Sequence, residues 1–142
     1  MSSVKPSPPH VLALLDHAFR GARKVLEAAV PPIPGLRPSH FRLLDYTPSE
    51  GIRLTDLAQR ANMTKQALGE MVATLQAAGL VQVAPDPNDG RARLVNLTPE
   101  GRRVRDRIKR TIGAIERDLR HRVGAEKWAV FREVLDELAR PS

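Results

Sequence analysis

The chain has 142 residues, of which 42% are hydrophobic, 27% are charged and 4% are aromatic. This length fits one compact domain, or a small lobe with an oligomerisation element, and the hydrophobic share excludes wholesale disorder. The formal net charge of +7 at pH 7 favours a polyanionic partner, because basic side chains that neutralise phosphates release counterions. A merely solvated basic surface is the alternative that charge alone leaves open.

The absence of cysteine excludes disulfides, thiolate metal sites and thiol-based redox sensing. His10, His17, His40 and His121 are scattered without acidic residues at ligand spacing, and no Gly-rich phosphate loop is present. We therefore expect no metal, no cofactor and no enzymatic activity. The chain also lacks the apolar run of a signal peptide and the roughly 18 apolar residues of a membrane span, which predicts a cytoplasmic protein.

The first third of the chain predicts two helices after an irregular start. Prolines in residues 1–9 block regular structure, so we expect a disordered tail there. Apolar residues at steps of three and four predict a helix over 10–30, which the proline-rich residues 31–34 end. A short second helix is expected from about Pro38, a residue that favours the first helical turn. Residues 47–51 have the composition of a turn.

The middle of the chain predicts a helix-turn-helix followed by a hairpin. Thr55 is the expected N-cap of a helix over 56–61, and Thr64 caps a second helix over 65–78. Alternating residues over 80–83 and 93–97 predict two strands, and the polar turn formers of residues 85–90 connect them.

Two further helices are expected after the hairpin. Thr98 caps the first of them, which carries a long apolar stripe as far as Val123 before Gly124 breaks it. A last helix carries Trp128 and Phe131. The resulting fold class is mainly α with a small β-hairpin wing: a winged helix-turn-helix lobe plus a helical dimerisation region.

Polar residues at the start of the second helix of the pair suit the reading of DNA. A recognition helix places its first residues against base edges in the major groove, where Lys65, Gln66 and Glu70 offer complementary donors and acceptors. Arg91 and Arg93 follow the hairpin tip, at the reach of an adjacent minor groove. An ordinary helical hairpin with a solvated polar face is the alternative for the first group, and solvated arginines for the second.

Acidic residues flank the turn of the hairpin. Asp89 lies two residues before Arg91 and can hold its guanidinium through a charge-assisted bond. Ordinary turn chemistry is the alternative role for Asp86 and Asp89.

The chain resembles MarR-type transcriptional regulators over residues 10–140. The resemblance rests on the hairpin Asp86-Pro87-Asn88-Asp89-Gly90-Arg91 with the following Leu94-Val95-Asn96-Leu97-Thr98-Pro99-Glu100-Gly101, and on the upstream segments Leu57-Ala58, Thr64-Lys65-Gln66-Ala67-Leu68 and Ala78-Gly79-Leu80-Val81. It implies a homodimer joined by its first, fifth and sixth helices on a palindromic DNA site. It also implies that Thr64, Lys65, Gln66 and Glu70 contact the major groove or phosphates, that Arg91 enters the minor groove and that Asp89 positions it. Glu70 and Gly90 depart from the family pattern, where a basic or polar residue and an Arg are common, which affects base preference and wing affinity.

The expected organisation is a single MarR-like domain over 10–142. Residues 38–101 form the winged helix-turn-helix, and residues 10–37 and 102–142 form dimerisation helices whose apolar stripes exceed what one lobe covers. An intramolecular bundle is the alternative. The basic residues of the long helix are expected mostly in solvent; they are Arg102, Arg103, Arg105, Arg107, Lys109 and Arg110.

The family resemblance also implies a small aromatic or anionic effector, bound between the dimer helices and the DNA-binding lobe. The candidate ligand residues at that junction are His17, Arg20, His40, Phe41 and Tyr46, with surface or core roles as the alternative. The expected function is a ligand-responsive repressor that binds a palindromic operator as a homodimer. Rival interpretations are a winged-helix module for protein contact, or nonspecific DNA binding.

Overall fold

The structure is a computed structural model that describes residues 7–30 and 32–141. Most of the expected tail over 1–9 lies outside the described residues, and residues 7–10 carry no helix or strand. The elements in chain order are α1 (Val11–Ala29), α2 (Pro38–Tyr46), β1 (Ile52–Arg53), α3 (Leu54–Arg60), α4 (Lys65–Ala77), β2 (Val81–Asp86), β3 (Asp89–Leu97), α5 (Pro99–Val123) and α6 (Ala125–Ala139).

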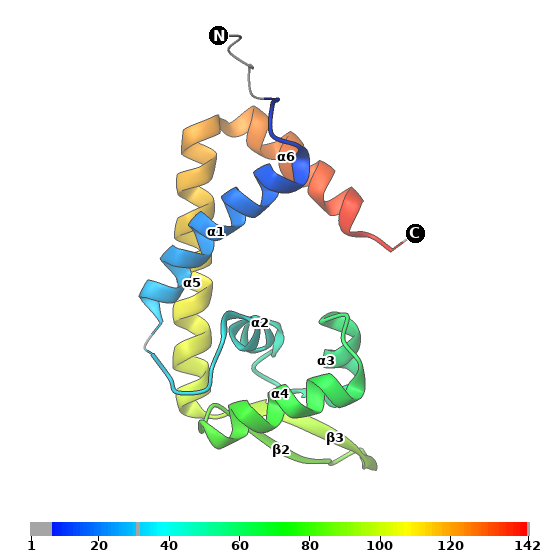
Figure 1. Cartoon of the computed structure of the whole chain (residues 1–142). Coiled ribbons are helices and arrows are strands. Elements are labelled where there is room, and N and C mark those ends of the chain that lie inside the picture. The colour runs from blue at the N-terminus through cyan, green and yellow to red at the C-terminus, as the bar shows by residue number, and fades with distance from the viewer. Residues whose placement is uncertain (1–6, 31, 142) are drawn as a thin grey trace.

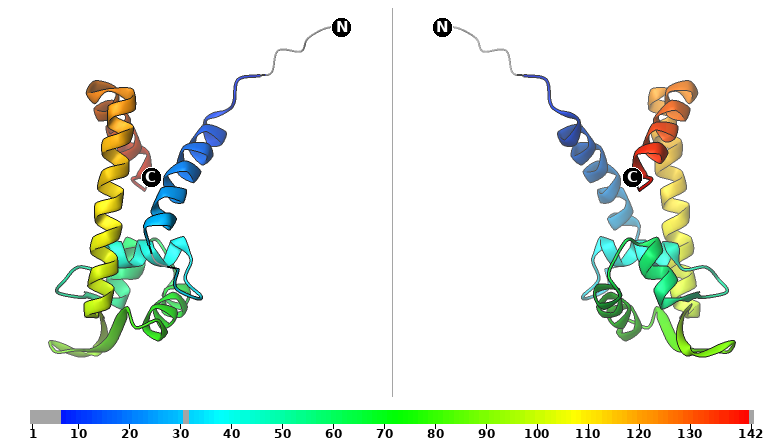
Figure 2. Two further views of the ribbon diagram at one scale, coloured as in Figure 1. Left: turned by 90° about the vertical axis from the view of Figure 1, so that its left-hand side faces the viewer. Right: turned by 90° about the vertical axis from the view of Figure 1, so that its right-hand side faces the viewer.

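The molecule has two parts joined by the long helix α5 (Figure 1). Helices α2, α3 and α4 and the three-stranded antiparallel sheet, in the order β1-β3-β2, form a lobe at one end of α5. Helix α6 folds back from the other end of α5, and α1 crosses α5. The views in Figure 2 show α1 diverging from α5 towards the end that carries the α5–α6 connection. The predicted fold class is confirmed.

Local signals in the sequence set the ends of the helices. The Oγ1 atom of Thr64 accepts a hydrogen bond from the backbone N–H of Ala67 at 3.2 Å, and Thr98 Oγ1 accepts from Gly101 at 3.0 Å. Both threonines therefore act as the predicted N-caps. Gly124 separates α5 from α6 with φ +92°, a conformation that side chains disfavour.

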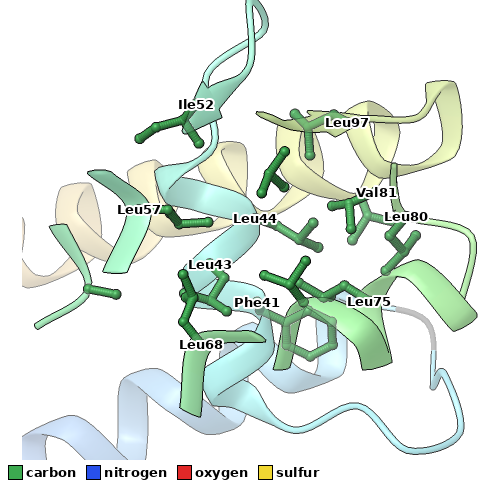
Figure 3. Close-up of a cluster of buried hydrophobic side chains, with 14 of the residues drawn as sticks. Phe41, Leu43, Leu44, Ile52, Leu57, Leu68, Leu75, Leu80, Val81 and Leu97 are labelled. Atoms are coloured by element: carbon green, nitrogen blue, oxygen red, sulfur yellow. The ribbon is translucent and has the colours of Figure 1, made fainter. Parts of the chain in front are cut away.

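One hydrophobic core lies inside the lobe, where α2, α3 and α4 meet the sheet and the first turns of α5 (Figure 3). Its fully buried side chains include Leu43, Leu44, Leu57, Leu68, Leu75, Leu80, Val81, Val95 and Ile108. In contrast, neither α1 nor α6 has a buried residue. The lobe is therefore packed within one chain, whereas the remaining helices keep much of their apolar surface exposed.

The start of α5 lies directly against the end of α4. The hydroxyl of Thr98 donates to the carbonyl of Gly79 at 2.6 Å, and the backbone N–H of Thr98 donates to the carbonyl of Leu80 at 3.0 Å. A Cβ atom at Gly101 would collide with the Leu80 carbonyl, so this position requires glycine. The junction therefore fixes α5 to the segment that joins α4 to the wing.

The structure corrects two expectations about element boundaries. Thr55 is not an N-cap, because α3 begins at Leu54 and Arg53 takes the cap position without a side-chain hydrogen bond. The wing strands are longer than predicted and leave only residues 87–88 as the turn. Strand β1 was not predicted, and it pairs with β3 through Ile52 with Val95 and Arg53 with Leu94.

Arg105 departs from the expected solvent-facing pattern of the long helix. Its side chain is buried; Nη1 donates to the carbonyl of Thr47 at 3.1 Å, and Nη2 donates to Ser49 Oγ at 3.0 Å. One turn further along α5, Lys109 Nζ forms an ion pair with Asp45 at 3.0 Å. These contacts attach α5 to the end of α2 and to the turn that leads into β1.

Candidate nucleic-acid interface

Helix α4 and the wing lie at the same end of the molecule, opposite the α5–α6 connection (Figures 1 and 2). Strand β2 follows α4 after a short turn and contacts it, so the helix and the hairpin are held as one unit. Both elements leave a polar surface open to solvent at this end.

The outer face of α4 brings together the residues predicted to read DNA. Thr64, Lys65, Gln66 and Glu70 are all exposed, whereas the opposite face is buried. The Thr64 oxygen accepts the capping bond, which leaves its hydroxyl proton available as a donor. The positive end of the helix dipole also lies here, so this end of α4 suits contact with phosphates and base edges.

The wing presents two exposed arginines, Arg91 and Arg93, on β3. The carboxylate of Asp89 accepts a hydrogen bond from the backbone N–H of Arg91 at 3.1 Å. The expected bond from Asp89 to the Arg91 guanidinium is not observed, because Asp89 takes part in none of the ion pairs among the described residues. Asp89 instead orders the backbone from which the Arg91 side chain projects.

Asp86 is the buried acidic residue of the wing. Its Oδ2 atom accepts from Arg53 Nε at 2.8 Å, and its Oδ1 atom accepts from the backbone N–H of Asn88 at 2.9 Å. The hydrogen bond from Asn88 and the neighbouring Arg53 guanidinium lower the pKa of Asp86. Turn chemistry alone was foreseen for Asp86; Arg53 was missed, since 33 positions separate the pair.

A cavity of about 440 Å³ lies between α1, α2 and α5, where the lobe meets the outer helices. Phe41 lines it, as predicted. Two cations that were not predicted, Arg23 and Arg42, also line it. Its remaining lining residues are Phe19, Ala22, Leu26, Pro38, Ser39, Asp45, Ile108, Ile112, Ile115 and Glu116. An apolar space with cations at its border suits a small molecule that carries an anionic group.

The other four predicted ligand residues do not line this cavity. His40 is buried, and its Nδ1 atom accepts from the backbone N–H of Arg37 at 3.0 Å; burial lowers the pKa of His40. Tyr46 is half-buried at the end of α2. On α1, His17 is exposed and Arg20 pairs with Asp16 at 3.0 Å. Their positions along α1 and α2 suggested a place at the junction, but none of the four lines the cavity.

Within residues 7–30 and 32–141, no group of three or more His, Asp or Glu side chains is arranged to hold a metal ion. No helix in the same residues has the length and hydropathy needed to cross a bilayer.

The sequence model of the MarR family matches residues 35–92, which include α2, the helix-turn-helix and the wing tip. An HTH-type transcriptional repressor of Mycobacterium tuberculosis is 27% identical over 116 residues, which cover 82% of this chain and 84% of the repressor.

Three solved structures share the fold. The regulator PcaV of Streptomyces coelicolor, in complex with its natural ligand, matches with a TM-score of 0.75 at 24% identity and covers 98% of this chain and 97% of its own. A mutant MarR of Escherichia coli in complex with operator DNA has a TM-score of 0.73 at 22% identity, with 90% and 92% covered. Bordetella bronchiseptica BpsR, whose DNA binding is regulated by 6-hydroxynicotinic acid, has a TM-score of 0.73 at 20% identity, with 96% and 100% covered. In the sequence of its DNA-binding lobe, in its similarity to the repressor and in its fold, this chain is similar to the MarR family of winged helix-turn-helix transcriptional regulators, whose members bind DNA and are not enzymes.

Proposed function

We propose that this protein is a cytoplasmic transcriptional repressor that binds a palindromic operator as a homodimer and responds to a small aromatic or anionic effector. The observation that carries the proposal is the common placement of the exposed polar start of α4 and the arginine-bearing wing at one end of the lobe. The net charge of +7 and the related M. tuberculosis repressor support it further.

On DNA, α4 enters the major groove and the wing follows the adjacent minor groove. Lys65 and Gln66 contact base edges or phosphates, together with Thr64, and Glu70 accepts from a cytosine amino group. Arg91 enters the minor groove, where the negative potential is enhanced when the groove is narrow. Arg93 is available for the backbone beside it.

The apolar surface that a single chain leaves exposed supports the homodimer. Leu12 on α1 is 74% exposed, Phe19 is 62% exposed, and Leu138 on α6 is 75% exposed. Monomeric proteins rarely expose contiguous apolar surface of this kind, and a two-fold dimer buries it isologously. The dimer then presents two recognition helices to successive major grooves, roughly 34–36 Å apart.

The cavity between α1, α2 and α5 is the proposed effector site. Phe41 and Ile112 supply apolar walls, and Arg42 forms no ion pair within the described residues, which leaves its guanidinium available to a carboxylate. The ligand of PcaV and the hydroxynicotinic acid that regulates BpsR support a small-molecule effector in this fold. Since the cavity borders both the lobe and α1, its occupant can change how the two parts are held.

The direct test is a binding titration with DNA from the upstream region of the protein's own gene, over a series of salt concentrations. Wild type should bind this DNA more tightly than a scrambled duplex, and binding should weaken as salt rises because counterions are released. Arg91→Ala should weaken specific binding by about tenfold, the cost of one groove contact. A matched loss of charge at the far end of the chain, Arg140→Ala, should leave binding unchanged.

Equal and weak binding to both duplexes, with no effect of Arg91→Ala, would contradict the proposal. That result would favour nonspecific DNA binding, and no binding at low salt would favour a module for protein contact.

The effector site is tested by adding benzoate and hydroxybenzoates to the protein–operator complex. We expect an aromatic carboxylate to release DNA from wild type, and Arg42→Met to require a concentration about tenfold higher, since the charge-assisted bond is lost. Arg20→Met is the control, because Arg20 lies outside the cavity. Equal sensitivity of both variants would exclude Arg42 as the carboxylate anchor.

A further inference from the structure

The contact between Arg53 and Asp86 joins the two outer strands of the sheet. Arg53 lies on β1 and pairs with Leu94 of the central strand β3, and Leu94 pairs on its other side with Ala84 of β2. Asp86 lies two residues beyond Ala84, at the tip of β2. The Arg53 side chain therefore reaches past β3 to bind the far strand at 2.8 Å, directly beside the turn of the wing.

The wing tip depends on Asp86 because its backbone ladder is weak there. The strand register shifts between Pro85 and Asp86, and neither Pro85 nor Pro87 has a backbone N–H to donate. The Asp86 carboxylate adds a hydrogen bond within the turn by accepting the N–H of Asn88. The side chain of Asp86 is only 7% exposed, so Arg53 and Asn88 supply the hydrogen bonds that its buried charge requires.

We infer that Arg53 is a positioning residue for DNA binding: with Asp86 it braces the wing tip so that Arg91 projects into the minor groove. The inference rests on the proposed function, in which Arg91 makes that contact. The geometric link is short, because Asp86 is the register partner of Asp89, and Asp89 holds the backbone N–H of Arg91. A braced hairpin loses less conformational entropy when it binds than a mobile one, so the brace strengthens binding without touching DNA.

Because Arg53 and Asp86 have opposite charges, substitutions at the two positions distinguish a bracing role from direct attraction to phosphate. If Arg53 acted only as a phosphate ligand, Arg53→Ala would weaken binding, but Asp86→Asn would strengthen it by removing a negative charge near DNA. If the pair acts as a brace, both substitutions weaken operator binding. We expect a loss of about fivefold to tenfold in affinity for each, comparable with the loss in Arg91→Ala.

A double-mutant cycle with Arg91 provides the second test. In the braced wing, Arg53→Ala already removes most of the Arg91 contribution, so Arg53→Ala/Arg91→Ala should bind no more than about twofold worse than either single variant. Additive losses would overturn the inference. Arg53→Lys should recover only part of the affinity, because an ammonium cannot reproduce the Nε geometry. Arg140→Ala is the matched control, since it removes an exposed Arg–Asp pair at the C-terminal end of α6, outside α4 and the wing.

Hydrogen exchange of the DNA-free protein tests the brace independently of DNA. Amides of residues 86–93 should exchange faster in Arg53→Ala and Asp86→Asn, while amides of α4 keep their wild-type rates. Unchanged exchange in the wing would overturn the inference, whatever the DNA affinities. If Arg91→Ala itself leaves binding unchanged, the proposed role of the wing fails; if Arg91→Ala weakens binding but Arg53→Ala and Asp86→Asn do not, only the brace fails.

Discussion

His40 is a buried imidazole that accepts a backbone hydrogen bond at the start of α2. Burial holds its pKa below the ordinary value of about 6.5, so the unfolded chain binds a proton there before the folded protein does. Stability is therefore lost as the pH falls through about 6.5 towards the lower folded pKa. We predict that His40→Gln, which keeps an acceptor at this capping position without a titrating group, reduces the loss of stability between about pH 7.5 and pH 5.5.

Urea unfolding at the two pH values, at one protein concentration, measures this difference. His121→Gln is the control, because His121 is exposed on α5 and should keep the wild-type pH dependence. The assignment to His40 would be wrong if His40→Gln and wild type lost the same stability on acidification.

At the residue scale, the sequence predicted side chains whose partners are close along the chain. Thr64 and Thr98 act as caps because each bonds a backbone amide three residues away. Arg53, in contrast, meets Asp86 across 33 positions, and Arg105 meets Thr47 across 58. A single Arg in a basic sequence gives no sign of such a partner, so both were missed or placed in solvent. The DNA-contacting residues remain predictions, although the structure exposes them on one end of the lobe.

The attachment of α5 to the turn before β1 depends on the buried Arg105. Replacing it with Met leaves the carbonyl of the 2%-exposed Thr47 without its side-chain donor, which costs roughly 1–3 kcal/mol. We predict that Arg105→Met lowers the free energy of unfolding by about that amount in a urea titration.

Arg107→Met is the matched substitution, since Arg107 is exposed on the same helix. It should change stability by less than about 0.5 kcal/mol. Similar losses in both variants would mean that Arg105 contributes only through the general charge of α5.

Among the secondary-structure elements, length and capping decided what could be predicted. The helices have sustained periodicity and recognisable ends, so their order and approximate limits were predicted correctly. β1 has only two residues and shows no alternation, and its pairing with β3 is a long-range contact. The hairpin was predicted, but its strands continue through Asp86 and Asp89, because the dense turn formers of this segment resemble a longer loop.

At the scale of the whole molecule, neither α1 nor α6 has a buried residue. A dimer interface would cover the apolar side chains that these two helices leave exposed. We predict that Leu138→Glu, which introduces a charge at a 75%-exposed apolar position, shifts the protein from dimer to monomer and weakens operator binding by more than tenfold. Sedimentation at several protein concentrations measures the oligomeric state. The circular dichroism of the variant should still show helical structure, because no residue of α6 belongs to the core of the lobe.

Ala129→Glu supplies the control on the same helix. Position 129 lies nine residues before Leu138, two and a half turns along α6, and so on the opposite face. The Ala129→Glu variant should remain dimeric although it carries the same added charge. A monomeric wild type, or a dimer that tolerates Leu138→Glu, would contradict an interface through this face of α6.

Helix α5 starts at the junction with the wing and continues for 25 residues to the connection with α6. At 1.5 Å per residue it is about 37 Å long, and the contacts of Thr98 with Gly79 and Leu80 make its first turn move together with the wing. It therefore acts as a lever. If α5 tilts by about 5° about its end at α6, the wing at its other end moves by about 3 Å, half the ~6 Å width of a minor groove. A ligand that alters the angle between α1 and α5 could thus take the protein out of register with its operator without touching the surface that reads DNA.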